Sequence, residues 1–354
     1  MKEIDDLHIK QIAPLISPQE LKKEFTADNS NYNFIIESRK TITKILQRRD
    51  DRLLAIVGPC SIHDAAAGLE YAEKLKELSK QIDDEIYPVM RVYFEKPRTT
   101  IGWRGLIMDP DMDDSYDIHK GLHLSREFLL KIAKMELPTG TEMLDPIIPQ
   151  YISDLISWAA VGARTSESQT HRSLASGMSI PVGFKNGTGG NLDLAVNAIN
   201  TAIHPSSFIG INQQGNTCIL RTEGNSSCHL ILRGGRTGPN YYEEDVEEAV
   251  TLMENTDIEN PSVIIDCSHA NSGKKFTRQK RVFHSVMDQV LYGQKNIAGV
   301  MMESNLFEGN QKFTGCFGDL RYGVSITDSC IGWNETEELL LSAAEDLREY
   351  RKNK

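Results

Sequence analysis

Four residues in this chain combine thiol, imidazole and carboxylate groups, which are the donors that a transition metal takes in proteins. They stand far apart in the sequence, each close to the end of a short apolar run or in the loop beyond it: Cys60, His269, Glu303 and Asp328. Each also has an ordinary structural explanation, as a small buried thiol, a hydrogen-bonded core histidine or a salt-bridge acid. No short spacing such as C-x-x-C joins them, so a metal site depends on the fold bringing them together.

A second group of residues at comparable places is basic: Arg91, Lys96, Arg98, Arg164, Lys185 and Arg233. Surface charges paired with nearby acids are the usual fate of single Arg and Lys residues. If these six converge, however, their mutual repulsion is costly unless anionic ligands offset it. Arg binds phosphate and carboxylate with two parallel hydrogen bonds and Lys supplies a point charge. The group therefore favours a site for two small phosphorylated or carboxylated substrates.

The metal donors and the basic residues are positioned by eight short, nearly continuous apolar runs, which we interpret as strands. Such runs, separated by amphipathic helical segments, are typical of buried parallel strands with crossover helices. The runs are LLAIVG, PVMRVYF, TGTEML, AAVGA, PVGFK, HLILR, SVIID and AGVMME, and the clearest helical segments are 66–80, 192–202, 242–254 and 283–291. Eight such units predict an α/β protein with a (β/α)8 TIM barrel, in which polar residues at the carboxyl ends of the strands meet at one end.

Two segments fall outside this alternation. Residues 1–50 read as a helical extension, with the capping box Ser17-Pro18-Gln19-Glu20 and an apolar period from Phe34 to Leu46. FIGINQ and TCILRTE, joined by a Gly/Asn turn, predict an inserted hairpin at about 207–224. We expect one decorated domain, with the catalytic barrel over residues 51–354.

Composition narrows the class of protein. The chain has 354 residues and a net charge of −11, which argues against a nucleic-acid surface. The N-terminus has acidic residues and no long uncharged run, so we expect a soluble, cytoplasmic protein that does not bind a membrane. The six cysteines are scattered through a large chain, which favours reduced thiols.

Long ordered blocks of the sequence carry a family resemblance: GPCSIHD, MRVYFEKPRTTIGWRGLI, GARTSESQTHR, PVGFKNGT, ILRGG, IDCSHANS, MMESNLFEGNQ and SITDSCIGW. Over essentially the whole chain they resemble the microbial type I 3-deoxy-D-arabino-heptulosonate-7-phosphate (DAHP) synthases. The resemblance implies a transferase that condenses phosphoenolpyruvate with erythrose 4-phosphate and water, releasing phosphate. This is the first step of the shikimate pathway to chorismate and the aromatic amino acids.

The resemblance also implies residue roles. It assigns one divalent metal to Cys60, His269, Glu303 and Asp328, and it leaves open whether the ion is Mn, Fe, Co, Zn or Cu. Phosphoenolpyruvate would be bound by Arg91, Lys96, Arg164, Lys185 and Arg233, and erythrose 4-phosphate by Pro97, Arg98, Thr99 and Asp328. Glu142 would position the attacking water, and Lys96 and His269 are candidates for moving protons.

Members of this family are commonly feedback-inhibited by an aromatic amino acid and assemble as homotetramers built from dimers. The matching effector residues here are Pro149, Gln150, Met178, Ser179, Phe208 and Gly210, with Asp6 and Ile9 contributed by a neighbouring subunit. In relatives a serine at the position of Gly210 accompanies phenylalanine sensing. Glycine leaves room for a phenol hydroxyl, so tyrosine is the expected effector, although the same residues could serve ordinary interface packing.

Three alternatives remain at this point. A sister barrel synthase adds phosphoenolpyruvate to arabinose 5-phosphate, but KPRTT followed by IGWRG matches the enzymes with the four-carbon substrate better. A Schiff-base aldolase would use Lys185 as its nucleophile. A metabolite sensor would bind anions without turnover, but it would not need four metal donors.

Overall fold

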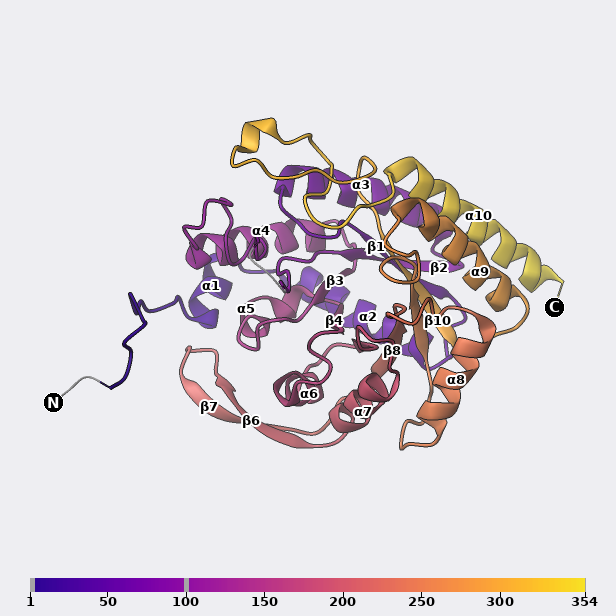
Figure 1. Cartoon of the computed structure of the whole chain (residues 1–354), viewed down its shortest axis with the longest axis horizontal. Helices are drawn as coiled ribbons and strands as arrows, with labels where there is room; N and C mark the ends of the chain where they lie inside the picture. Colours follow the sequence, from indigo (N-terminus) through magenta and orange to yellow (C-terminus); the bar gives the residue numbers. More distant parts are fainter. Residues whose placement is uncertain (1–3, 99–101, 354) are drawn as a thin grey trace.

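The computed structural model describes residues 4–98 and 102–353. Eight parallel strands close into a barrel in the order β1-β10-β9-β8-β5-β4-β3-β2, which confirms the predicted TIM barrel (Figure 1). All eight predicted apolar runs supply a barrel strand: β1 (Leu53–Gly58), β2 (Ile86–Arg91), β3 (Thr139–Glu142), β4 (Trp158–Val161), β5 (Val182–Lys185), β8 (Cys228–Leu232), β9 (Val263–Asp266) and β10 (Ile297–Glu303). Nearly every residue of these strands is buried, which explains why their sequences are apolar without alternation.

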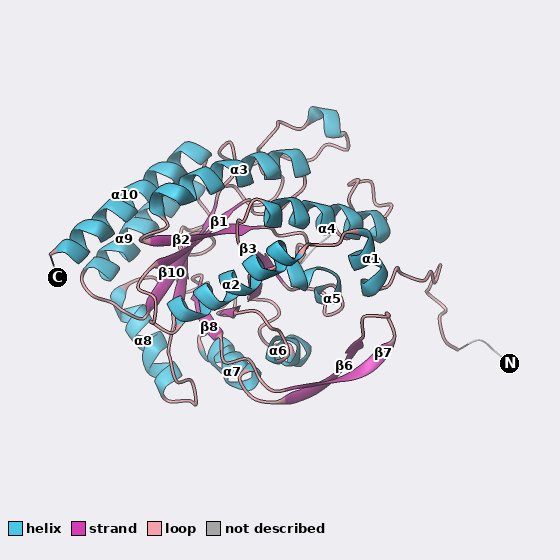
Figure 2. Ribbon diagram, turned by 180° about the vertical axis from the view of Figure 1, so that it is seen from behind, coloured by secondary structure: helices cyan, strands magenta, loops and turns pink. Residues whose placement is uncertain are grey.

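Helices cover the outside of the barrel and supply the crossovers (Figure 2). They are α3 (Ala65–Ile82), α4 (Ile118–Lys134), α5 (Pro149–Ile152), α6 (Gln169–Ser176), α7 (Asp193–Ala202), α8 (Glu243–Glu254), α9 (Gln279–Leu291) and α10 (Trp333–Lys352), with 3-10 turns η1 (Ser153–Leu155), η2 (Phe276–Arg278) and η3 (Phe317–Asp319). Aspartate caps begin two of the long ones, because Asp64 accepts from Ala66 N–H and Asp117 accepts from Lys120 N–H.

The N-terminal extension is helical only in part. Residues 4–17 contain no helix or strand. Tyr151 OH donates to the Ile16 oxygen, so the end of the segment contacts the body, and the part before it leads away (Figure 1). The predicted capping box at Ser17 is present, and it begins α1 (Pro18–Glu24). The longer α2 (Asn29–Leu46) follows, and it lies across the amino-terminal end of the barrel (Figure 2). Three residues near its end, Ile42, Ile45 and Leu46, pack with the apolar side chains of the barrel interior.

The inserted hairpin is also present, as the antiparallel pair β6 (Ser206–Ile211) and β7 (Thr217–Thr222). It lies outside the barrel beside α6 (Figure 1). One face packs on the body through Phe208, whereas Ile209 and Ile219 on the other face are 77% and 71% exposed. These two paired isoleucines form a small exposed apolar patch, with the polar Ser207, Arg221 and Thr217 on the same face.

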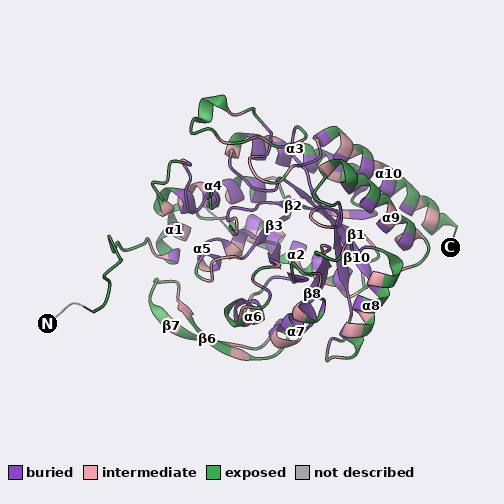
Figure 3. Ribbon diagram, in the orientation of Figure 1, coloured by how far each residue is buried: buried purple, intermediate pink, exposed green. Residues whose placement is uncertain are grey.

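Burial follows this architecture, with the strands and the inner helix faces buried and the outer helix faces exposed (Figure 3). One apolar cluster fills the space between the strands and the helices, and a second fills the barrel interior. Among the described residues, no helix is both long and apolar enough to cross a membrane.

Candidate active site

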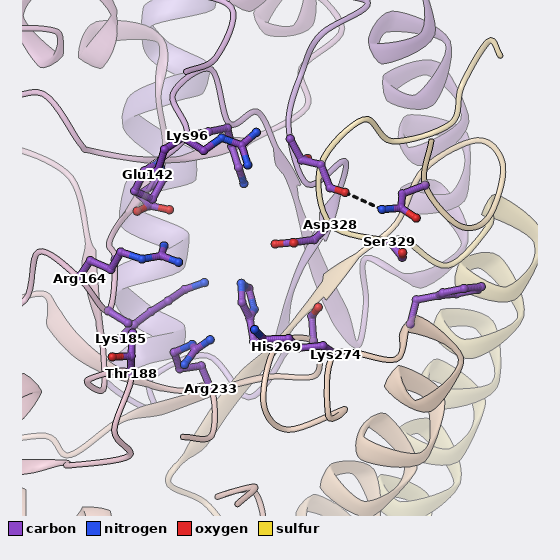
Figure 4. Close-up of a pocket in the computed structure, with 18 residues that line it drawn as sticks. Lys96, Glu142, Arg164, Lys185, Thr188, Arg233, His269, Lys274, Asp328 and Ser329 are labelled. Atoms are coloured by element: carbon purple, nitrogen blue, oxygen red, sulfur yellow. Dashed lines mark hydrogen bonds between the residues drawn. The ribbon is translucent and has the colours of Figure 1, made fainter. Parts of the chain in front are cut away.

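A cavity of about 360 Å3 opens at the carboxyl ends of the barrel strands. Polar side chains enter it from several strand ends and from the loops that follow them (Figure 4). The fold thus brings most of the predicted residues together. Those that line the cavity are Lys96, Pro97, Arg98, Glu142, Arg164, Lys185, Arg233, His269 and Asp328. The predicted Thr99 lies outside the described residues.

Three of the four predicted metal donors form a compact group. Ligand atoms of Cys60, Glu303 and Asp328 all lie within 4.8 Å of one another, and Cys60 Sγ is 3.8 Å from Asp328 Oδ2. Burial raises the pKa of the Cys60 thiol to about 11, with Glu303 contributing and Lys96 opposing. A bound cation would favour the thiolate instead. A soft sulfur donor beside two carboxylates suits a divalent transition metal.

His269 lies in the same cavity but outside that compact group. Its Nδ1 is 2.9 Å from Asp266 Oδ2, although the ring N–H does not point well at that oxygen. The backbone at His269 has φ +53°, in the left-handed region that non-glycine residues rarely adopt. Such a turn at the end of β9 directs the imidazole into the cavity (Figure 4). A nitrogen ligand held by a carboxylate through its other nitrogen is common in metal sites.

Glu303 is held from two sides. Ser268 Oγ donates to its Oε2 at 2.8 Å, and the side-chain amide of Gln279 both donates to its backbone oxygen and accepts from its backbone N–H at 2.9 Å. Burial works against ionisation of Glu303, but His269, Arg91 and Lys96 outweigh it and lower its pKa to about 2. The side chain is therefore a fixed carboxylate at neutral pH.

A basic wall faces the donor group across the cavity. The side chains of Arg164, Lys185 and Arg233 point into it from one side, and Asp328 enters from the other (Figure 4). Lys185 Nζ is 2.9 Å from Asp266 Oδ2. Burial alone would lower the pKa of Lys185, but Asp266 raises it, so the ammonium stays charged. Burial together with the nearby Arg164 lowers the pKa of Arg233, although the guanidinium remains a cation.

Arg91 is placed differently from the rest of the basic group. Its side chain is 1% exposed, and its NH2 lies 3.4 Å from Glu303 Oε1. The guanidinium lies over the Tyr93 ring at 4.0 Å from the centroid. Its NH1 has no hydrogen-bond partner among the described residues. A buried N–H donor without an acceptor lowers the stability of the fold, so we expect a ligand or water to accept a hydrogen bond from it. Arg91 is buried against Glu303 and is not among the residues that line the cavity, so its predicted contact with a substrate stays a prediction.

The loop after β2 carries the other cations. Lys96 Nζ lies 3.1 Å from both the backbone oxygen and the Sγ of Cys60. Backbone contact from Lys96 N–H to Arg104 oxygen at 2.9 Å brings the two ends of the loop together. Arg98 Nε donates to the Trp103 oxygen at 2.8 Å, and its side chain is exposed at the cavity mouth. Lys96 therefore contacts the donor group, and Arg98 lies at the opening of the cavity.

Glu142, at the end of β3, lines the cavity close to Gly162. A Cβ atom at position 162 would collide with Glu142 Oε1, so only glycine leaves this carboxylate its place. The predicted role of Glu142 in positioning water needs such an opening toward the cavity.

Several residues of the site escaped the sequence-based prediction. Asp266 anchors both Lys185 and His269, and Gln279 clamps Glu303, yet neither carries a predicted role. Both side chains are fully buried. The cavity is also lined by Thr188, Ser268, Lys274, Phe276, Asn310, Thr327 and Ser329. Position relative to strand ends could have pointed to Asp266, the last residue of β9, whereas Gln279 gives no such signal.

The predicted effector residues lie around the hairpin. Pro149 and Gln150 begin α5, Met178 and Ser179 follow α6, and Phe208 and Gly210 are on β6. The Gln213 side chain donates to Gln150 Oε1 at 3.0 Å, so the hairpin turn contacts α5. Asp6 and Ile9 belong to the exposed N-terminal segment.

Fold and site together define a barrel enzyme whose charge-lined cavity holds a metal-type donor group and a basic wall. A family model for the DAHP synthetase I family matches residues 24–341. The chain is 49% identical over 344 residues to the Tyr-sensitive phospho-2-dehydro-3-deoxyheptonate aldolase of Escherichia coli (strain K12), covering 97% of this chain and 96% of the relative. It is also 49% identical over 348 residues to the Phe-sensitive enzyme of that strain, covering 98% of both.

A solved structure agrees with these matches. The phospho-2-dehydro-3-deoxyheptonate aldolase of Francisella tularensis SCHU S4 superposes with a TM-score of 0.93 at 46% identity, covering 96% of this chain and 98% of that one. The chain therefore belongs to the DAHP synthetase I family. Its activity is DAHP synthesis, a transferase reaction in the biosynthesis of aromatic amino acids, as the sequence blocks predicted.

Proposed function

We propose that the chain condenses phosphoenolpyruvate with erythrose 4-phosphate at this cavity, with a divalent metal held by Cys60, Glu303, Asp328 and His269. One observation carries the proposal. The basic side chains of Arg164, Lys185 and Arg233 line a cavity of about 360 Å3, and a group of donors suited to a metal lies on its other side. Phosphoenolpyruvate has a carboxylate and a phosphate, which match that wall. When bound, the metal supplies Lewis acidity toward the aldehyde oxygen.

The basic wall would hold phosphoenolpyruvate by its charged ends. Arg164 and Arg233 suit the phosphate, and Lys185, fixed by Asp266, suits the carboxylate end. Arg91 is buried beside Glu303, and its NH1 has no hydrogen-bond partner among the described residues, so it would add its charge from behind the lining residues. Because Lys185 is already balanced by Asp266, substrate binding must offset mainly the charges of the two arginines.

The loop after β2 would hold erythrose 4-phosphate. Pro97 and Arg98 line the cavity, and the Arg98 side chain is exposed and able to take a phosphate. Thr99 follows them in the sequence and is proposed as a further phosphate ligand, although it lies outside the described residues. Asp328 enters from the opposite side, which suits a hydroxyl of the sugar chain as well as the metal. The aldehyde carbon would then lie between this loop and the donor group.

The bond changes follow from these positions. The enol carbon of phosphoenolpyruvate attacks the aldehyde carbon, and the aldehyde oxygen takes a proton. Lys96, within 3.1 Å of Cys60, and His269 are the charged or ionisable groups placed to provide it. Water, positioned by Glu142, adds to the substrate's second carbon. The added water gives up one proton, which replaces the one taken by the aldehyde oxygen. As the C–O bond to phosphate breaks, the remaining hydroxyl proton passes to the departing phosphate and the second carbon becomes a ketone, and the phosphate leaves along the arginine side chains.

One assay tests reaction and metal together. Phosphate release from phosphoenolpyruvate should require erythrose 4-phosphate, disappear after chelation and return with a divalent metal. Arabinose 5-phosphate should not replace erythrose 4-phosphate. If borohydride traps a covalent adduct at Lys185 and chelation has no effect, the chain is a Schiff-base aldolase and the proposal is wrong.

We further propose that tyrosine is the feedback effector, bound beside the hairpin. A Cβ atom at Gly210 would come within 2.8 Å of the Leu220 side chain and 3.5 Å of the Phe208 ring, so glycine leaves more space there than serine. Relatives named as Tyr-sensitive and as Phe-sensitive are both 49% identical to the chain, so overall identity does not decide the preference, and the proposal rests on the space at Gly210. Isothermal titration should show tight Tyr binding; tight Phe binding without Tyr binding would reject the idea.

A homotetramer built from dimers would complete this effector site with Asp6 and Ile9 of a neighbour. In support, Ile4, Leu7 and Ile12 of the N-terminal segment are 80%, 62% and 78% exposed, and the outer hairpin face exposes Ile209 and Ile219. Contact between these surfaces in different subunits would cover both. Sedimentation equilibrium should give four subunits, and deletion of residues 1–15 should reduce that number.

A further inference from the structure

A second cavity lies at the opposite end of the barrel from the active-site cavity. It has a volume of about 470 Å3, and its walls include Leu53 and Ile297, the first residues of β1 and β10. The C-terminal parts of α9 and α10, which run side by side on the barrel, form another wall (Figure 1). The end of α2 completes it. This volume is within the range of small-molecule sites.

The floor of this cavity is apolar. Five buried side chains from four elements or their edges contribute to it: Ile45, Leu53, Ile297, Ala298 and Leu347. A ligand with a ring-sized apolar body would remove these groups from water. A small, strongly hydrated ion would gain nothing from them.

The rim of the cavity has more cations than anions. Arg48, Arg52, Lys295 and Arg351 line it with Asp50 and Asp51. Two of the cations are already neutralised, because Arg52 NH2 lies 2.7 Å from Asp50 Oδ2 and Arg351 Nε lies 2.5 Å from Glu85 Oε2. Across residues 4–98 and 102–353, neither Arg48 nor Lys295 has an ion-pair partner. Arg351 NH1 also lies 3.9 Å from Asp51 Oδ2, so the rim and its ion-pair partners hold four cations and three carboxylates, and Arg48 and Lys295 are the two cations over the apolar floor without such a pair among the described residues.

The backbone at Arg48 is a second, independent observation. Arg48 has φ +57°, just beyond the end of α2, where Arg49 N–H bonds to the Lys44 oxygen at 2.8 Å. Glycine is the usual residue at this position of a helix end, because other side chains are strained there. Arg48 keeps this conformation although glycine would relieve the strain, and it places the arginine side chain at the cavity rim.

We propose that this cavity binds a small carboxylate with a ring-sized apolar body. Arg48 and Lys295 would pair with the carboxylate, and the body would lie against Ile45, Ala298 and Leu347. Parts of β1 and β10 line the floor of this cavity and lead, at their other ends, to Cys60 and to Glu303. An occupant would therefore contact the two strands that carry metal donors, without contacting the substrate cavity.

Phenylpyruvate is a suitable probe, titrated calorimetrically into the full chain with saturating phosphoenolpyruvate and tyrosine present to fill other sites. We expect saturable binding, with cyclohexanecarboxylate also binding and inorganic phosphate not binding. Absence of phenylpyruvate binding, or equal binding of inorganic phosphate, would overturn the proposal.

The Arg48→Gly variant makes the test sharp, because it removes the charge and the backbone strain together. Its unliganded Tm should rise by about 2 °C, which shows that the fold is intact. Phenylpyruvate binding should weaken at least tenfold, since a charged partner is lost. Lys295→Gln should weaken binding as well. The matched control is Arg49→Gln, an adjacent exposed arginine outside this cavity, and unchanged binding is expected. Wild-type affinity in Arg48→Gly would show that the probe binds elsewhere.

Discussion

The two ends of the barrel are built from the same strands, but one end buries ion pairs and the other buries apolar side chains. At the carboxyl end, buried ions face one another, with Lys185 2.9 Å from Asp266 and Arg91 3.4 Å from Glu303. Toward the amino end the interior is apolar, and α2 closes it with Ile42 and its neighbours. Buried ions are costly and unforgiving of change, whereas apolar packing tolerates small changes. The carboxyl end is therefore organised for charged substrates, whereas the apolar interior at the amino end stabilises the scaffold beside the second cavity.

The largest effect should come from Cys60→Ala at the carboxyl end. Loss of the thiolate should release the metal and lower kcat/KM on the order of 10³-fold, because Lewis acidity contributes several kcal/mol. The fold should persist, since alanine only shortens the side chain. Metal content by mass spectrometry and phosphate release measure both effects.

Cys316→Ala is the matched control for this cysteine, because Cys316 is exposed and outside the donor group. It should keep both metal and activity. Full turnover by Cys60→Ala with no metal bound would contradict the assignment of the donor group.

Asp266→Asn should rank next, with its main effect on stability. Burial opposes ionisation of Asp266, but His269 and Lys185 hold its pKa well below the usual range. The variant leaves Lys185 buried without its counter-charge, which costs on the order of 3 kcal/mol. Urea unfolding at pH 7 measures this, with the exposed Asp346→Asn as control. The wild-type advantage should shrink as pH falls below about 3.8, where the unfolded carboxyl is protonated. An advantage unchanged down to pH 3 would contradict the ion-pair explanation.

The fate of these residues shows what sequence alone can predict. The eight strands were predictable because parallel strands buried on both faces give continuous apolar runs. Placement at strand ends predicted that Lys185 and Arg233 face one cavity, which they line, and Asp328 joins them from the loop region after β10. The hairpin was also predicted, although β6 begins at Ser206, two residues before the apolar run.

The partners of the buried polar residues could not be predicted from the sequence. The helix predicted at 283–291 begins at Gln279 in the structure. The prediction started too late because the first turn is polar and shows no apolar period. That turn nevertheless contains Gln279, which is fully buried against Glu303. Likewise, nothing in the residue types shows that the turn at His269 points its Nδ1 toward Asp266. Pairings of this kind depend on the three-dimensional path of the chain.

A histidine within the barrel provides a pH test of the apolar end. His229 Nε2 accepts from the Trp158 indole N–H at 3.1 Å, and its Nδ1 lies 3.2 Å from the Ser227 oxygen. Burial lowers its pKa to about 4. The unfolded chain binds this proton near pH 6.5 and the folded chain does not. Folded stability should therefore decrease as pH falls from 6.5 to 4, by about 3 kcal/mol.

The measurement is the difference in unfolding free energy between wild type and His229→Gln across that pH range. Glutamine keeps an acceptor for Trp158 but cannot take up the proton, so its profile should lack this decrease. Other groups titrate in the same range; burial and Asp145 raise the pKa of Glu95 to about 8, for example. They act in both proteins and cancel in the difference. Parallel profiles would show that His229 is protonated in the folded state.

The smallest effect separates packing from function at the amino end. Ile42→Val removes one methyl group from a fully buried position on α2 and should cost about 1 kcal/mol of unfolding free energy. Ile36→Val is the matched control, because Ile36 is on the same helix but 47% exposed, and its cost should be near zero. Both variants should keep wild-type kcat and KM. If Ile42→Val changes KM for phosphoenolpyruvate, the apolar interior transmits strain from α2 through Met301 of β10 toward Glu303, and the two ends of the barrel are coupled rather than independent.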